Sequence, residues 1–117
     1  MKIMFIGTGA ADYNWTLYGQ PGINGSTATL IDSRLLIDCG PTAAAALERF
    51  GANRSAITDI VVTHHHGDHF SLDSLKKITA GREGKVQLFG TPQVCAEAAV
   101  VQKFTDHSPE CGRIVGN

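Results

Sequence analysis

The stretch Ile60-Val61-Val62-Thr63-His64-His65-His66-Gly67-Asp68-His69 joins a β-branched run to four of the chain's five histidines. A β-branched run favours a buried strand, so a strand is expected to lead into the histidines. In extended backbone, side chains two residues apart point the same way, so His64 and His66 can reach one metal ion while His65 faces the other side. Imidazole nitrogen is a ligand type that zinc prefers, and the spacing therefore predicts a metal site.

Gly67 permits a sharp turn after this pair. Asp68 and His69 are then expected to open a helix that runs to about Ala80. Such a turn would bring them to a second metal position beside the first, and two ions a few ångström apart could hold a bridging hydroxide at neutral pH. The alternative is a polar, histidine-rich loop that collects metal incidentally. His65 is expected to be a partly exposed spacer rather than a ligand.

The pattern Thr-His-x-His-x-Asp-His after a β-branched strand resembles the signature of the metallo-β-lactamase superfamily. Residues 1–9 resemble the first strand and turn of its ribonuclease Z and phosphodiesterase branches. Residues 35–40 resemble the strand ending in Asp-Cys-Gly that precedes the first helix of these branches. The resemblance runs from Met1 to about Phe89.

This resemblance implies an α/β fold, the αββα sandwich of the superfamily, to which the chain would supply one half made of a sheet and helices. Residues 1–117 would then be the N-terminal part of a single hydrolase domain. The superfamily pattern makes His64 and His66 ligands of a first metal, and Asp68 and His69 ligands of a second. Asp68 would also orient the attacking water, which makes it the catalytic candidate. Two zinc ions are expected, although manganese or iron would satisfy the same donors.

Members of the superfamily complete the site with a third histidine, a bridging carboxylate and a last histidine further along than this sequence reaches. After His69 only His107 remains. It falls at an expected helix end, where a histidine is expected to cap the helix or to be solvated rather than to bind metal. The chain therefore looks like one half of a domain, and a folded half would need a second copy to cover its exposed sheet face.

Alternating short strands and helices are predicted along the rest of the chain. Strands are expected at 2–6, 27–31, 34–37 and 86–89, with a tight turn at Asp32 and Ser33 that makes a hairpin. Helices are expected from Pro41 to Phe50 and from Pro92 to about Phe104, because proline suits the first helical position. This order predicts a sheet with helices packed on one face.

Four features near the motif leave alternatives open. Asp38, at the end of its strand, could hydrogen-bond a metal-ligating imidazole from behind or accept backbone N–H bonds at the start of the Pro41 helix. Cys39 is expected to be a small buried thiol rather than a ligand. Backbone N–H groups of residues 7–9 could bind a phosphate. The aromatic residues of the long 8–26 connection could stack on a substrate or fold onto the core, and the second is expected.

Composition bounds the classes of function. A net charge of -1 and a pI near 6.5 give no electrostatic footprint for nucleic acid, so an RNA substrate would need a binding surface elsewhere. No stretch approaches the roughly 20 apolar residues needed to span a bilayer, and residues 1–6 are too short for the core of a signal peptide. The three cysteines, without Cys-x-x-Cys spacing, suit reduced thiols, and a cytoplasmic protein is expected.

The motif and the resemblance together predict a metal-dependent hydrolase, with two zinc ions, that uses a metal-bound hydroxide. The resemblance to the phosphodiesterase branch alone implies the substrate class, a small-molecule or nucleotide-like phosphodiester. A hydrolase of lactones, thioesters or β-lactams on the same fold would share every residue discussed. A different class of protein is the alternative for the isolated chain. In that case it binds metal through an incomplete site and catalyses nothing by itself.

Overall fold

The computed structural model describes residues 1–9, 15–63, 69–81, 86–102 and 110–113. They form a six-stranded sheet in which the spatial order of the strands follows the chain order. The strands are β1 (Ile3–Gly7), β2 (Ala28–Ile31), β3 (Leu35–Ile37), β4 (Asp59–Val61), β5 (Gln87–Gly90) and β6 (Glu110–Arg113). The helices are α1 (Ala43–Arg49), α2 (Leu72–Thr79) and α3 (Pro92–Gln102), with 3-10 turns η1 (Trp15–Leu17) and η2 (Arg54–Ala56).

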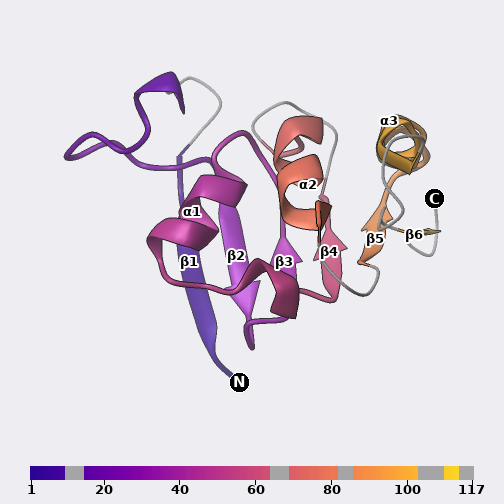
Figure 1. The fold of residues 1–117 in the computed structure, drawn as a ribbon, viewed down its shortest axis with the longest axis horizontal. Helices are drawn as coiled ribbons and strands as arrows, with labels where there is room; N and C mark the ends of the chain where they lie inside the picture. The colour runs from indigo at the N-terminus through magenta and orange to yellow at the C-terminus, as the bar shows by residue number, and fades with distance from the viewer. Residues whose placement is uncertain (10–14, 64–68, 82–85, 103–109, 114–117) are drawn as a thin grey trace.

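The sheet is antiparallel at its beginning and parallel afterwards. Strands β1, β2 and β3 pair antiparallel, and β3, β4, β5 and β6 pair parallel. A helix lies between each pair of consecutive parallel strands in the sequence, as parallel pairing requires. Helix α1 contacts α2, α2 contacts α3, and Figure 1 shows α1 and α2 in front of the sheet. The prediction of helices on one face is confirmed.

The hydrophobic core lies between the sheet and these helices. Leu30, Leu36, Ile60 and Leu88 are partners across four neighbouring strands, and each is at most 2% exposed. The helices cover this row with buried residues that include Ala43, Ala46, Leu47, Leu75, Ile78, Val94 and Ala98. Burying a leucine or isoleucine contributes about 1.5–3 kcal/mol, so this row is a main source of stability.

The opposite face of the sheet is mostly apolar, and we call it the open face. Its apolar side chains alternate with the core row and are Ile3, Phe5, Ile31, Leu35, Ile37, Val61 and Phe89, and the polar residues Thr29, Asp59 and Gln87 lie on the same face. Phe5 is 67% exposed and Ile3 is 49% exposed. No helix or strand of the described ranges lies over this face, because the three helices occupy the other one.

The predicted hairpin is confirmed, and the helix boundaries differ from expectation. Asp32 and Ser33 have φ of 52° and 59°, the positive values that a type I′ turn requires at both central positions. Helix α1 begins at Ala43 rather than Pro41, because Thr42 is the N-cap and Pro41 lies in the turn before it. Helix α3 begins at Pro92, as predicted. Within the described ranges, no helix has the length and apolar character to cross a bilayer.

Candidate functional site

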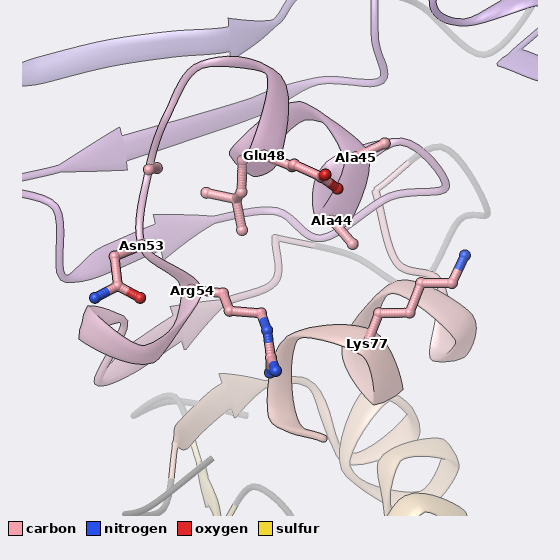
Figure 2. Close-up of a pocket in the computed structure, with 8 residues that line it drawn as sticks. Ala44, Ala45, Glu48, Asn53, Arg54 and Lys77 are labelled. Carbon is pink, nitrogen blue, oxygen red and sulfur yellow. The ribbon is translucent and has the colours of Figure 1, made fainter. Parts of the chain in front are cut away.

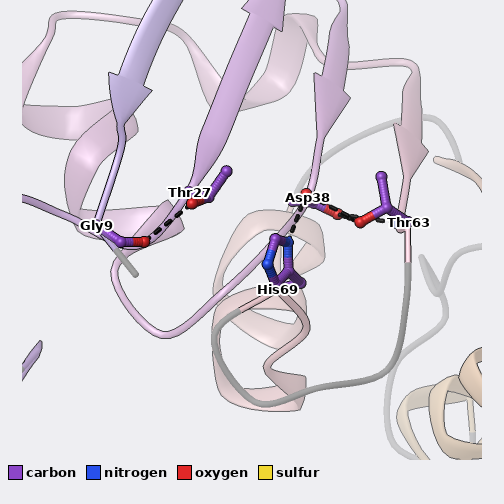
Figure 3. A network of polar contacts seen from close by, with 5 residues as sticks. All are labelled: Gly9, Thr27, Asp38, Thr63 and His69. Carbon is purple, nitrogen blue, oxygen red and sulfur yellow. Dashed lines mark hydrogen bonds and ion pairs between the residues drawn. The ribbon is translucent and has the colours of Figure 1, made fainter. Parts of the chain in front are cut away.

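Five of the six strands end at one edge of the sheet, where Asp38, Thr63 and His69 lie. Because β1 is antiparallel to β2 and β2 is antiparallel to β3, β1 runs in the same direction as β3, β4 and β5. Asp38 follows β3, and Thr63 lies two residues after β4. Segment 64–68 then leads to His69, which returns to the same edge beside Asp38 (Figure 3). Ligand sites of open parallel sheets commonly lie outside the carboxyl ends of the strands.

Asp38 is the centre of a hydrogen-bond network at this edge. Its Oδ1 accepts from the Thr63 backbone N–H at 2.8 Å and from the Thr63 hydroxyl at 2.9 Å. Its Oδ2 lies 2.7 Å from Nδ1 of His69. The Asp38 side chain is 5% exposed and that of His69 is 18% exposed. A buried carboxylate needs such partners, and here the donors come from both sides of segment 64–68.

The main chain at residues 69–71 is fixed to the residue after Asp38. Cys39 donates its N–H to the His69 carbonyl at 2.8 Å, and Ser71 donates to the Cys39 carbonyl at 2.7 Å. These bonds hold the chain extended, in a parallel bridge between Cys39 and Phe70. The prediction that the helix opens at Asp68 and His69 is therefore wrong. Helix α2 begins at Leu72, with the Ser71 hydroxyl accepting from Ser74 N–H as its cap.

Of the two roles left open for Asp38, the described contacts show the one with His69. Helix α1 has Thr42 as its N-cap and no side-chain cap hydrogen bond. The Asp38 carboxylate instead bonds Thr63 and His69. The sequence suggested that Asp38 could face an imidazole, but it did not single out Thr63. The only available signal was the position of Thr63 at the same sheet edge as Asp38.

The other predicted site residues lie outside the described residues. These are His64, His65, His66 and Asp68 in segment 64–68, and His107 in segment 103–109. The metal-ligand set accordingly stays a prediction. Within the part of the chain that the structure describes, no group of three or more His, Cys, Asp or Glu side chains is placed to hold a metal ion.

His69 nevertheless has the chemistry that a metal ligand needs. A carboxylate accepts hydrogen bonds, so Nδ1 facing Oδ2 of Asp38 carries the proton. In a neutral imidazole the lone pair is then on Nε2, the atom that would bind a metal. Histidine ligands of metals commonly donate their other N–H to a carboxylate in this way. The described end of the motif fits a zinc site.

Cys39 contributes to this site through its main chain and not as a thiol ligand. It is fully buried and free, as expected for a small core thiol. Burial, and to a lesser extent the nearby charge of Asp38, raises the pKa of the Cys39 thiol to about 12. At neutral pH it is therefore protonated and a poor metal ligand. Cys95 is disulfide-bonded, so the expectation that all three thiols are reduced is wrong for that residue.

The loop that follows β1 is bonded to the 24–27 segment. Gly9 donates its N–H to the Gly25 carbonyl at 2.7 Å, and Thr8 donates to Oδ1 of Asn24 at 3.3 Å. The idea that these two N–H groups bind a phosphate is therefore wrong, since each already has an acceptor. Tyr18 packs against the core, as expected for the aromatic residues of this connection.

A groove lies away from this edge, between α1 and α2 (Figure 2). Its volume is about 560 Å³, and its lining includes Ala44, Ala45 and Glu48 of α1 but neither Asp38 nor His69. Arg54 in the groove donates to the carbonyls of Ile78 and Ala80, which satisfies the end of α2. Its polar side chains thus stabilise the helices, and the groove is not the candidate site.

Comparisons with known proteins agree with the fold. A protein named Anti-Pycsar protein Apyc1 from Paenibacillus xerothermodurans is 32% identical over 109 residues, covering 92% of this chain and 40% of that protein. The chain thus spans less than half the length of this relative.

Two solved structures share the fold. Human tRNase Z, short form (ELAC1), matches with a TM-score of 0.70 and 24% identity, over 95% of this chain and 43% of that one. The metallo-β-lactamase fold protein YhfI from Bacillus subtilis matches with a TM-score of 0.69 and 15% identity, over 96% of this chain and 46% of that one. These matches confirm the predicted metallo-β-lactamase fold.

The comparisons also point to one family, which the resemblance to the ribonuclease Z and phosphodiesterase branches did not name. The family model described as Anti-Pycsar protein Apyc1 matches residues 1–103. Because this match spans most of the 117 residues, the chain belongs to the Anti-Pycsar protein Apyc1 family, with the metallo-β-lactamase fold.

Proposed function

We propose that this chain carries the first metal-binding motif of a metal-dependent hydrolase that acts on phosphodiesters. The observation that carries the proposal is the 2.7 Å contact between Asp38 and Nδ1 of His69, at the carboxyl edge of the parallel strands. A buried carboxylate thus lies behind the last histidine of a His-x-His-x-Asp-His sequence, an arrangement common for metal-ligating imidazoles.

The residues that would hold the metals are those of the motif. His64 and His66 would bind a first ion, and Asp68 and His69 a second, with zinc preferred and manganese or iron compatible with the same donors. When bound, the ions would lower the pKa of a water molecule and offset the charge that develops on the phosphoryl oxygens. Asp68 would orient the attacking water. Asp38 would keep the proton on Nδ1 of His69 and so leave Nε2 for the metal.

A phosphodiester is the proposed substrate class, and cyclic nucleotides are the first candidates. The relatives are named Anti-Pycsar protein Apyc1, and we take that name to point to a phosphodiesterase-like action on cyclic nucleotides. Such a substrate is small, so it needs no extended basic surface, in keeping with the net charge of -1. Lactones, thioesters and β-lactams remain the alternative substrates on this fold.

A second candidate function applies to the 117-residue chain by itself. The chain spans 40% of the length of the relative from Paenibacillus xerothermodurans, and the motif supplies only part of the donors that two metal ions need. The chain alone would then bind metal and catalyse nothing. A partner, expected to be a second copy, would be needed for any turnover.

Metal content separates the two candidates. The purified chain is dialysed against a mild chelator, and its zinc is measured by inductively coupled plasma mass spectrometry. Two ions per chain would support the complete site, and one would support the incomplete site. A chain that retains no zinc, manganese or iron would contradict both.

Substitution of a single histidine of the motif tests whether that histidine binds metal. We expect His66→Ala to lose at least one metal ion and any zinc-dependent hydrolysis of bis(p-nitrophenyl) phosphate or of a 3′,5′-cyclic nucleotide. His65→Ala is the matched control, because it removes the neighbouring imidazole that is expected to be a spacer, and it should keep the metal content of the unmodified chain. Equal losses in both variants would contradict the ligand assignment, and rapid hydrolysis of a lactone panel without phosphodiester hydrolysis would contradict the substrate class.

A further inference from the structure

Both ends of segment 64–68 are held by a single buried carboxylate. Thr63 immediately precedes this segment and His69 immediately follows it. Asp38 Oδ1 accepts from the backbone N–H and the hydroxyl of Thr63, and Oδ2 faces Nδ1 of His69. The Thr63 hydroxyl also lies 3.2 Å from Oδ2. A change in the orientation of this carboxylate would therefore alter its hydrogen bonds to Thr63 and to His69 together.

The backbone of Asp38 allows this carboxylate little freedom. Its φ is 67°, in the left-handed region that costs a residue with a side chain about 1–2 kcal/mol. The N–H of Asp38 donates to the Val61 carbonyl at 2.7 Å, and Cys39 is bonded to both His69 and Ser71. The Cα of Asp38 is thus fixed between β4 and the start of α2. The remaining freedom is rotation of the side chain about its own bonds.

The Thr63 hydroxyl restricts the remaining rotation of the Asp38 side chain. The backbone N–H of Thr63 donates to Oδ1, and one hydrogen bond of this kind leaves the carboxylate plane able to turn about it. The hydroxyl contacts Oδ1 at 2.9 Å and Oδ2 at 3.2 Å, from a second direction. The N–H and the hydroxyl of Thr63 therefore fix the plane of the Asp38 carboxylate. The orientation of Oδ2 toward Nδ1 of His69 is fixed with it.

We propose that Thr63 is a positioning residue, whose hydroxyl orients the Asp38 carboxylate so that His69 is held with its proton on Nδ1 and its Nε2 lone pair directed to a metal. This inference rests on the proposed function, since it assigns a role toward the metal that His69 would bind. Thr63 is not one of the proposed metal ligands, so this role is an addition to the ligand set. The effect passes from Thr63 to Asp38 to His69.

The chain offers a matched control at the same sheet edge. Thr27 donates its hydroxyl to the Gly9 carbonyl at 2.9 Å and lies apart from the Asp38 network (Figure 3). Thr27→Val therefore removes a threonine hydroxyl and its hydrogen bond without touching Asp38. Thr63→Val makes the same chemical change inside the network. Thr63→Ser keeps the hydroxyl and should rescue whatever Thr63→Val loses.

The experiment has one readout without metal and one with zinc, both on the full 117-residue chain. Long-range ¹H–¹⁵N NMR of the metal-free protein reports which nitrogen of His69 carries the proton. We expect the Nδ1–H form in the unmodified chain, in Thr63→Ser and in Thr27→Val, and a mixture of the two forms in Thr63→Val. Competition with a chromophoric chelator should then show zinc affinity about tenfold weaker in Thr63→Val alone, at the lower end of the range for residues behind a metal ligand.

The outcomes distinguish this inference from the proposed function. If the unmodified chain binds no zinc, the proposed function fails, while the NMR spectra of the metal-free variants still decide the role of Thr63. If zinc binds and Thr63→Val matches the unmodified chain in both readouts, the inference on Thr63 is overturned by itself. If Thr63→Val does not fold, the unmodified chain decides, since an Nε2–H form of its His69 would overturn the inference.

Discussion

At Asp38, hydrogen bonding compensates for a backbone conformation that is unfavourable for aspartate. The sequence placed this residue at the correct sheet edge, because the end of a strand can be recognised from its apolar run. It could not predict the φ of 67° or the bonds to Thr63, since both depend on where β4 ends relative to β3. Aspartate tolerates the left-handed region better than most residues, which agrees with its use here. Strain of this kind is commonly found at functional sites.

Cys39 provides a prediction for a single residue. Because the thiol is fully buried and its pKa is raised to about 12, it is protonated and inaccessible in the folded protein. We expect no alkylation of Cys39 by iodoacetamide at pH 8 within a time that fully modifies the unfolded chain. Mass spectrometry of the peptide that contains Cys39 measures this, with the urea-unfolded protein as the control. Rapid modification under native conditions would contradict the buried position.

The elements differ in how well their sequence predicts them. The hairpin and the start of α3 are confirmed, because Asp32-Ser33 and Pro92 determine local backbone angles. The start of α2 was placed too early, because the bonds between residues 69–71 and Cys39 hold that segment extended. Those bonds join positions about 30 residues apart, and no pattern within the segment indicates them. Ser71 is a typical N-cap residue, but Asp68 competes with it in the sequence.

Helix α2 also provides a prediction about stability. Ser74 is buried, and its hydroxyl donates to the Gly40 carbonyl at 2.7 Å, which ties α2 to the turn after Asp38. We expect Ser74→Ala to lower the free energy of unfolding by about 1 kcal/mol, because it removes a buried hydrogen bond, while the Gly40 carbonyl keeps the bond that it accepts from the Ala43 N–H. Asp73→Ala is the control, since the exposed Asp73–Lys77 pair contributes at most about 0.5 kcal/mol. Urea denaturation compares the two variants, and equal losses would contradict the assigned contact.

For the whole molecule, the described helices cover one face of the sheet and leave the open face without a helix over it. An exposed sheet face was expected from the sequence, because the chain resembles one half of a superfamily domain and its helices were predicted on one face. The open face includes Phe5 and Ile3, which are 67% and 49% exposed. The metal-ligand set could not be predicted to the same degree, because a complete site needs residues that are distant in sequence. Such an exposed apolar surface favours association.

Self-association of the purified chain follows from this surface. We expect analytical ultracentrifugation to show a dimer, with the open faces of two copies in contact, and Phe5→Lys to shift it toward the monomer by at least tenfold in dissociation constant. Phe50→Lys is the matched control, because Phe50 is 49% exposed at the end of α1 and not on the sheet. A chain that remains monomeric at high concentration, or variants that dissociate equally, would contradict association through this face.

The agreement between strand order and chain order has a consequence for the way this protein folds. Each strand pairs with the strand before it, so every new strand finds the edge of a sheet that is already formed. Assembly can then proceed from the N-terminus during synthesis, without waiting for a distant partner. The longest connection between paired strands runs from β4 (Asp59–Val61) to β5 (Gln87–Gly90) and contains α2, and loop-closure entropy rises only slowly with length. Thr63 and His69 would thus reach Asp38 before β5 and β6 leave the ribosome.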